Sequence, residues 1–188
     1  MSTPASPDPG HAAASCRGFT FIEIIAVVAI LSMLAAVAIP GLGSIVERYR
    51  IRRASEDLGA SLFLARTEAI RRGGNITLRR ATSTACPAAS DWSCGWLIFV
   101  DADNDGIFDP GEQPVQVSPA PKGVAVKMKI ANPADLLKVN RWGRFNDTIG
   151  AFSVKLSPAG QPDSALAIIL CMSTGGRLRN IRPPESCD

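Results

Sequence analysis

Five acidic residues gather in one short stretch, "DADNDGIFDPGE", which spans residues 101–112. Their spacing follows the calcium-loop pattern D-x-[DN]-x-[DN]-G-x₅-E, in which carboxylate oxygens surround a cation. The candidate ligands are Asp101, Asp103, Asp105, Asp109 and Glu112. Gly106 would supply the sharp turn. Carboxylates this close repel one another without a cation, so calcium is a candidate cofactor.

The alternative for this stretch is a hairpin turn whose acids are only solvated and form local turn hydrogen bonds. An EF-hand needs a helix on each side of the loop. Here β-prone runs flank it, and Pro110 and Gly111 stand where the exit helix would begin. The sequence leaves both interpretations open.

A group of basic residues lies near the C-terminus in "GGRLRNIR", residues 175–182. Arg177 and Arg179 alternate, so on a strand they would project from the same face, and Arg182 follows just beyond. The planar guanidinium group donates two hydrogen bonds at once to a phosphate. Taken alone, however, two arginines in a strand favour a solvated edge that discourages aggregation.

A third unusual residue is Glu23, the only ionisable side chain between Phe19 and Pro40. This apolar run has the length of a transmembrane helix. A carboxylate within a bilayer is costly and usually has a partner, although a position near the end of the span softens the cost. Arg17 just before the run favours a cytoplasmic N-terminus by the positive-inside rule.

The cysteines indicate the compartment of the protein, and the lack of catalytic groups argues against an enzyme. Cys86 with Cys94, and Cys171 with Cys187, form two local pairs. Because a membrane segment precedes them, two disulfides outside the cytoplasm are the favoured interpretation, with reduced thiols as the alternative. The only histidine, His11, precedes the apolar run, and no nucleophile with a nearby base can be assembled. We therefore do not expect an enzyme.

A long helix and a series of strands must position these residues. Helical spacing continues after Pro40, and "RRGGN" at 71–75 predicts the end of the helix. The apolar residues with this spacing are Ile45, Tyr49, Leu58, Leu62, Ala65 and Ala69. Strands are predicted at 75–80, 95–100, 113–118, 124–130, 135–142, 151–157, 165–172 and 176–181. The expected fold class is α+β, with the helix packed on antiparallel sheet.

The string "RGFTFIE" at 17–23 resembles the type IV prepilin signature. The resemblance implies cleavage between Gly18 and Phe19 by prepilin peptidase, methylation of Phe19, and Glu23 as the fifth mature residue. Glu23 would then pair with the freed amine of a neighbouring subunit during assembly. The implied parts are a leader at 1–18, a transmembrane and fibre-core helix at 19–40, its amphipathic continuation at 41–72 and a periplasmic head at 73–188.

Two further strings, "CGWLIFVDADNDGIFDPGEQPV" and "LCMSTGGRLRNI", resemble the FimT/GspH family of minor pilins and pseudopilins. The resemblance implies a type IV pilin-like fold. FimT-type minor pilins carry a C-terminal G-R-x-R element implicated in DNA capture, and "GRLR" at 176–179 fits it. Arg177, Arg179 and Arg182 are therefore candidate contacts to double-stranded DNA, since aromatic residues for single-strand stacking are sparse here.

The expected protein is a minor pilin of a type IV pilus, in the fibre or at its tip, that contributes to DNA capture in natural transformation. The alternative is a structural, GspH-like pseudopilin of a type II secretion system, involved in protein secretion. Both place the chain in the inner membrane as a single-pass protein with a periplasmic head. Both also imply other pilins or pseudopilins as partners through the N-terminal helix.

Overall fold

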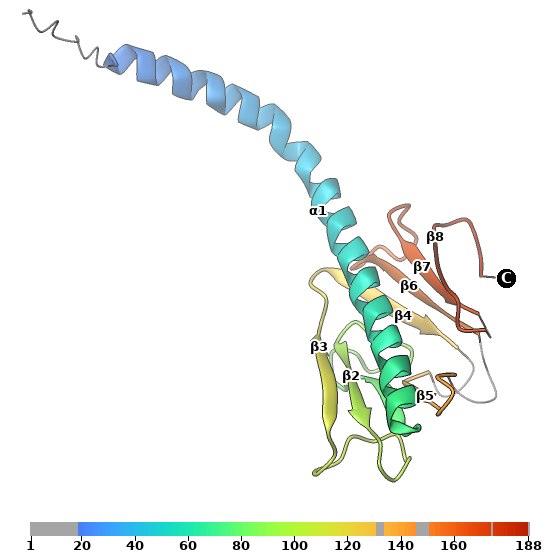
Figure 1. Cartoon of the computed structure of the whole chain (residues 1–188). Coiled ribbons are helices and arrows are strands. Elements are labelled where there is room, and N and C mark those ends of the chain that lie inside the picture. The colour runs from blue at the N-terminus through green and yellow to red at the C-terminus, as the bar shows by residue number, and fades with distance from the viewer. Residues whose placement is uncertain (1–18, 131–133, 146–150, 174, 188) are drawn as a thin grey trace, which may run out of the picture. The chain divides into compact units, whose positions relative to one another are not determined.

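The computed structural model describes residues 19–130, 134–145, 151–173 and 175–187, without the side chains of 37–42 (Figure 1). Gly18 lies outside the described residues and Phe19 inside them, so only one side of the predicted cleavage site is described. The chain forms two compact units, 1–42 and 43–188.

One helix, α1, runs from Phe21 to Arg72. Its first turn is closed by a capping box: the Thr20 hydroxyl accepts from the Glu23 N–H at 3.3 Å, and the Glu23 carboxylate accepts from the Thr20 N–H at 3.4 Å. At the other end Gly73 adopts a φ of 81°, and the Gly74 N–H donates to the Ala69 carbonyl at 2.7 Å. This Schellman arrangement confirms the predicted helix end.

The apolar side chains described in the first unit are solvent-exposed. Phe19 is 80% exposed and Leu34 is 62% exposed, and the large apolar residues between them are also exposed. A stripe of this kind on a lone chain has no packing partner of its own. Among the helices that the structure describes, none is both long enough and apolar enough to cross a membrane.

Within the described residues eight strands follow α1, and each overlaps one of the predicted runs. They are β1 (Ile76–Arg80), β2 (Gly95–Val100), β3 (Pro114–Pro119), β4 (Val124–Lys129), β5 (Leu136–Val139), β6 (Phe152–Pro158), β7 (Ile168–Met172) and β8 (Leu178–Ile181). They form two four-stranded sheets, in the order β3-β2-β1-β5 and β4-β6-β7-β8. Each described pairing is antiparallel, so the predicted α+β fold class is confirmed.

The second half of α1 supplies the buried stripe on which both sheets pack (Figure 1). Its buried residues recur every three or four positions, as a helix with one core-facing side requires: Ile51, Ala54, Leu58, Leu62, Ala65 and Ala69. Trp96 of β2 is 2% exposed, and its indole N–H donates to the Ser61 hydroxyl at 2.9 Å. The stripe thus combines apolar packing with a satisfied buried hydrogen bond.

The structure corrects the predicted burial of two helix residues and the predicted end of one strand. Ile45 and Tyr49 were expected on the buried stripe, but they are 62% and 63% exposed. Both precede Ile51, the first of the buried stripe, so sheet packing has not yet begun at their level. The strand predicted at 135–142 ends at Val139, because the chain turns at 140–143, where the Gly143 N–H donates to the Asn140 carbonyl.

Both predicted disulfides are present. Cys86 is bonded to Cys94, which closes the loop before β2. Cys171 of β7 is bonded to Cys187, which ties the segment after β8 back to the second sheet. The bridge restrains β8, which lies at the edge of that sheet and contains only four residues.

Neighbouring positions on α1 test the buried stripe. Leu62 is 1% exposed, whereas the adjacent Phe63 is 52% exposed. We expect Leu62→Ala to lower the free energy of unfolding by about 3 kcal/mol, because it leaves a cavity between helix and sheets. Phe63→Ala should lower it by less than about 1 kcal/mol. Urea unfolding followed by circular dichroism measures both, and equal losses would contradict the packing described here.

Candidate functional sites

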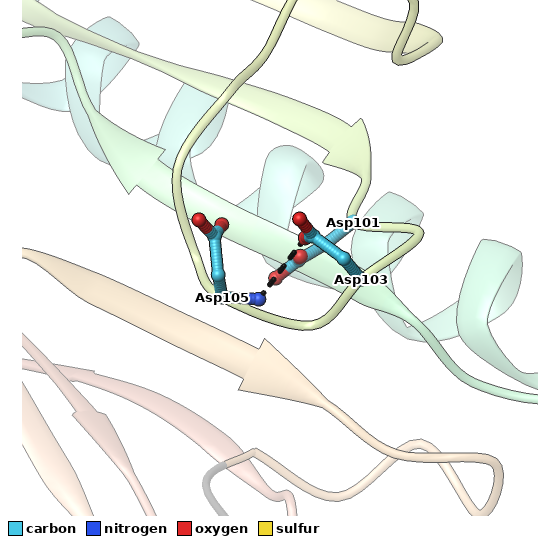
Figure 2. Close-up of side chains that lie close together, drawn as sticks. All are labelled: Asp101, Asp103 and Asp105. Carbon is cyan, nitrogen blue, oxygen red and sulfur yellow. Dashed lines mark hydrogen bonds between the residues drawn. The ribbon is translucent and has the colours of Figure 1, made fainter.

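The acidic loop, residues 101–112, joins β2 to β3, so strands flank it as the sequence indicated. Figure 2 shows the side chains of Asp101, Asp103 and Asp105 converging within this loop. One carboxylate oxygen from each lies within 4.8 Å of the others. Gly106 makes the predicted turn with a φ of 83°, and a Cβ at this position would lie 2.7 Å from a methyl group of Leu136. The turn therefore requires glycine.

Asp101 differs from the other four acids because it is fully buried. Its Oδ2 accepts a hydrogen bond from the hydroxyl of Thr77, on β1, at 2.6 Å. Its Oδ1 has no hydrogen-bond partner among the described residues. A buried carboxylate oxygen without a partner is costly, and such an atom in a folded protein calls for an explanation.

The remaining acids organise the loop backbone. Asp105 Oδ1 accepts from the Ile107 N–H at 2.6 Å, and Asp103 Oδ1 accepts from the Asp105 N–H at 3.3 Å. Glu112 spans the loop, because its two oxygens accept from the N–H groups of Ala102 and Asp109 at 2.9 and 3.1 Å. These bonds are the turn contacts of the alternative interpretation, and they leave the carboxylates charged.

Two basic side chains donate to the backbone of the loop. The Arg79 guanidinium donates to the Gly106 carbonyl, and the Lys138 ammonium donates to the Asn104 carbonyl. Within the described parts of the chain, no ion pair involves any of the five loop carboxylates. Negative charge therefore accumulates on one side of the first sheet.

The second sheet carries positive charge on its outer face. Residues directly opposite in a ladder share a face, and the register pairs Lys127 with Lys155 and Cys171 with Arg179. Lys129 shares the face of Lys127, because alternate residues point the same way. We call the following five residues the basic face: Lys127, Lys129, Lys155, Arg177 and Arg179. Arg177 stands one residue before β8, so the predicted common face of Arg177 and Arg179 stays a prediction.

Part of the basic face surrounds an open hollow of about 520 Å³. Lys127, Lys129, Lys155 and Arg179 line it, together with both cysteines of the Cys171–Cys187 bridge. Glu185 is the acidic residue in its wall. The bridge therefore helps to shape a hollow that four cations and several apolar side chains line.

The cations of the basic face differ in their internal partners. Lys127 forms an ion pair with Asp91 at 2.6 Å, and Lys155 forms one with Asp163 at 3.2 Å. Lys129, Arg177 and Arg179 make no ion pair within the residues that the structure covers. Three charged groups of the basic face are thus left to solvent or to an external anion.

Arg182 does not share this face. It lines a separate hollow with Arg52 and Glu56 of α1 and with Asn180. Leu178 of β8 packs on the core. Alternate residues of a strand point the same way, and Arg182 lies an even number of positions after Leu178, so it is placed toward the helix side of β8. The structure therefore separates Arg182 from the other two arginines of the predicted DNA site.

Two more arginines lie at the turn before β8. Arg66 of α1 donates to the Gly176 carbonyl at 3.1 Å, and Arg66 and Arg144 line the same small hollow beside Gly175 and Gly176. Arg144 therefore lies close to the turn that leads into the C-terminal arginines. Arg141 instead stacks over Trp142, with its guanidinium carbon 5.5 Å from the ring centroid.

Sequence reasoning missed Thr77, Lys127 and Lys129 at these sites. Thr77, which orients Asp101, gave no signal, because only the strand pairing brings it to the loop. Lys127 and Lys129 alternate in "VAVKMKI", which was visible as a shared face. What the alternation could not reveal was that β4 lies next to β6, and hence next to Lys155.

Comparisons with known proteins give a consistent result. The family model of type II transport protein GspH matches residues 54–176, well over half of the chain. The model of the prokaryotic N-terminal methylation motif matches residues 14–39. The chain is also similar to pilin-like protein PilA1 of Thermus thermophilus, with 26% identity over 170 residues, 88% of this chain and 91% of the relative.

Solved structures show the same fold. Two crystal forms of the type IV minor pilin FimU of Pseudomonas aeruginosa (strain PAO1) superpose with TM-scores of 0.54 and 0.51. Both share 21% sequence identity with the chain. They cover 77% and 73% of this chain and 99% of each solved chain.

The acidic loop has a measurable electrostatic signature. Desolvation raises the pKa of the Asp109 carboxyl above its ordinary value of 3.8, and the nearby carboxylates of Asp105, Asp103 and Glu112 raise it further. We expect Asp105→Asn to lower the Asp109 pKa toward 3.8, since it removes one repelling charge. A carbon-13 NMR titration without divalent cations measures this shift.

The raised pKa of Asp109 determines how its contribution to folding stability changes with pH. The contribution of Asp109 to stability is present below pH 3.8 and is lost as the pH rises through its folded-state pKa. Asp163→Asn removes an acid from the second sheet and should leave the Asp109 titration unchanged. An Asp109 pKa at or below 3.8 in the native chain would show that the loop charges do not interact in this way.

Proposed function

The chain belongs to the family of type II transport protein GspH and carries a prokaryotic N-terminal methylation motif, which makes it a minor pilin or pseudopilin. On that premise we propose that it is a structural, non-catalytic subunit of a type IV pilus whose head captures double-stranded DNA. Prepilin peptidase would cut between Gly18 and Phe19, and Phe19 would be methylated. The mature chain would be held in the inner membrane with its head in the periplasm.

Assembly is supported by the first unit of the chain. Its exposed apolar side chains, from Phe19 to Leu34, lack partners within that unit and suit packing against the helices of neighbouring subunits. Glu23 caps its own helix by accepting from the Thr20 N–H. A single hydrogen bond to a backbone amide leaves the carboxylate charge uncompensated, so it suits the freed amine of a neighbour.

DNA capture rests on one observation: Arg179 and Lys129 on the second sheet, and Arg177 directly before β8, are cations without an ion-pair partner among the described residues. Lys127 and Lys155 lie on the same face, although each already forms an ion pair, with Asp91 and Asp163. Such cations bind phosphate oxygens, displace counterions and do not read the base sequence. Strand pairing and the Cys171–Cys187 bridge hold the face in place, which lowers the ordering cost of binding.

A salt titration of duplex binding tests the proposal on the full-length chain in non-ionic detergent. The native chain should bind with a steep dependence on salt. Arg177→Ala/Arg179→Ala should lose most of the affinity and reduce the slope of log K against log salt by about 2, since each contacted phosphate contributes about 0.9. Lys129→Ala should reduce the slope further by about 1.

A matched control removes the same charge elsewhere. Arg52 and Arg53 lie on the exposed side of α1, where they pair with Glu56 and Asp57. Arg52→Ala/Arg53→Ala should leave the salt slope almost unchanged. If both double variants lose the same slope, binding follows net charge alone and the basic face is not the site. If the native chain fails to bind at low salt, DNA capture is wrong.

The second candidate function is a structural role in type II secretion, which is favoured by the description of the matching family. In that role the basic face would contact an acidic surface of a neighbouring tip subunit or of cargo. Failure of duplex binding together with retained assembly would make this the better interpretation. The identity of the neighbouring genes, pilus genes or secretion genes, would distinguish the two functions.

Glu23 provides a test of assembly. We expect Glu23→Ala to leave cleavage after Gly18 intact but to reduce incorporation into filaments at least about tenfold, since removing one partner of a buried ion pair costs about 3 kcal/mol. Mass spectrometry reports cleavage, and immunoblots of sheared filaments report incorporation. Glu56→Ala, elsewhere on α1, is the control and should assemble normally.

A second substitution separates assembly from capping. Glu23→Gln keeps an oxygen that can accept from the Thr20 N–H but removes the charge. If the charge pairs with a neighbour, Glu23→Gln assembles as poorly as Glu23→Ala. Normal assembly of Glu23→Gln would assign Glu23 to helix capping alone.

A further inference from the structure

Asp101 is the feature that the proposed function leaves unexplained. The side chain is fully buried, and its Oδ1 has no hydrogen-bond partner among the described residues. A buried carboxylate oxygen without a partner would destabilise a simple turn, because no interaction offsets its lost hydration. A residue of this kind needs either a proton or a cation beside it.

The surroundings of Asp101 hold its carboxylate beside the other acids of the loop. Thr77 donates to Oδ2, and the Asp101 N–H donates to the Asn75 carbonyl at 2.9 Å. Both contacts hold the side chain in one orientation. One oxygen of the Asp101 carboxylate lies within 4.8 Å of an oxygen from each of Asp103 and Asp105 (Figure 2). An orienting hydrogen bond to the second oxygen of a carboxylate is typical of metal sites.

We propose that the acidic loop binds one calcium ion, with Asp101, Asp103 and Asp105 as its central ligands. Asp109 and Glu112 provide the further carboxylates at the ninth and twelfth positions of the loop. The three central carboxylates come from successive alternate residues. Glu112 reaches back to the start of the loop, because its carboxylate accepts from the Ala102 N–H at 2.9 Å.

The chemical type of the candidate ligands indicates which metal ion the loop would bind. Every candidate ligand is a carboxylate oxygen, which suits calcium or magnesium rather than a thiolate- or imidazole-binding metal. Magnesium requires near-ideal octahedral geometry and gives up its water reluctantly, whereas calcium accepts six to eight oxygens in adaptable geometry. A loop with five carboxylates around a glycine turn meets the second requirement better than the first.

Binding would connect two strands of the first sheet to the loop. Asp101 follows β2 directly, and Thr77 belongs to β1. The ion would also neutralise charge that no ion pair compensates within the described chain, so the loop should become more stable. Phe108 packs edge-to-face on the buried Phe99, with ring centroids 5.3 Å apart, and anchors the same loop without metal. We therefore expect calcium to stabilise a fold that already forms without it.

Isothermal titration of calcium chloride into the full-length chain in detergent, after chelator treatment, tests the site. We expect one ion per chain with a dissociation constant of about 10⁻⁴ M or below, in the range of extracellular calcium modules. Magnesium chloride should bind at least about tenfold more weakly, because its geometry fits the loop less well. Calcium should also raise the melting temperature of the native chain by a few degrees.

Asp103→Asn/Asp105→Asn is the test variant, because both side chains are exposed and the fold should tolerate the change. It should melt like the native chain in chelator but lose calcium affinity at least about a hundredfold. The charge-matched control is Asp163→Asn/Glu185→Gln, which changes exposed acids of the second sheet and should bind calcium normally. The calcium site is refuted by an absence of binding up to several millimolar, or by equal affinity of native and test chains.

Discussion

The packing of one helix face against two sheets is the constraint on which the rest of the molecule depends. Between Ile51 and Ala69, α1 presents a stripe of buried residues, and both sheets use this stripe as their shared core wall. Neither four-stranded sheet has a second layer of its own among the described residues. Because each sheet buries its inner face on the helix, each is left with an outer face or a loop edge that is free to carry charge.

The charges are separated accordingly. The acidic loop belongs to the first sheet, at the β2–β3 connection, and the basic face belongs to the second sheet, across β4, β6, β7 and β8. The two regions share the helix stripe as support but no described ion pair. An anionic polymer and a divalent cation could therefore be bound by the same head without competing for the same side chains.

The sequence predicted the elements well because their local signals are strong. "RRGGN" ends the helix through glycine conformations that other residues avoid, and the runs of β-prone residues mark all eight strands. The exposed positions of Ile45 and Tyr49 were not predicted, because periodicity shows which residues share a face and not where packing begins. The calcium-loop pattern and the alternation of Arg177 with Arg179 were likewise visible in the sequence.

What the sequence could not supply was the neighbourhood of each element. The burial of Asp101 and its contact with Thr77 require the β1–β2 pairing, and the juxtaposition of Lys127 with Lys155 requires the β4–β6 pairing. The order of strands within the two sheets joins segments far apart in the chain. A local pattern carries no information about such non-local contacts, so Arg182 was grouped with arginines whose sheet face it does not share.

The bridge from Cys171 to Cys187 has a mechanical consequence. β8 is a four-residue strand at the sheet edge, held by hydrogen bonds to β7 alone. A force applied to such a strand from its end would peel it away one hydrogen bond at a time. With its C-terminal side bonded covalently to β7, tension at Arg179 passes into the interior of the sheet instead. A head built this way would resist a load applied at that end, and a reducing environment would remove that resistance.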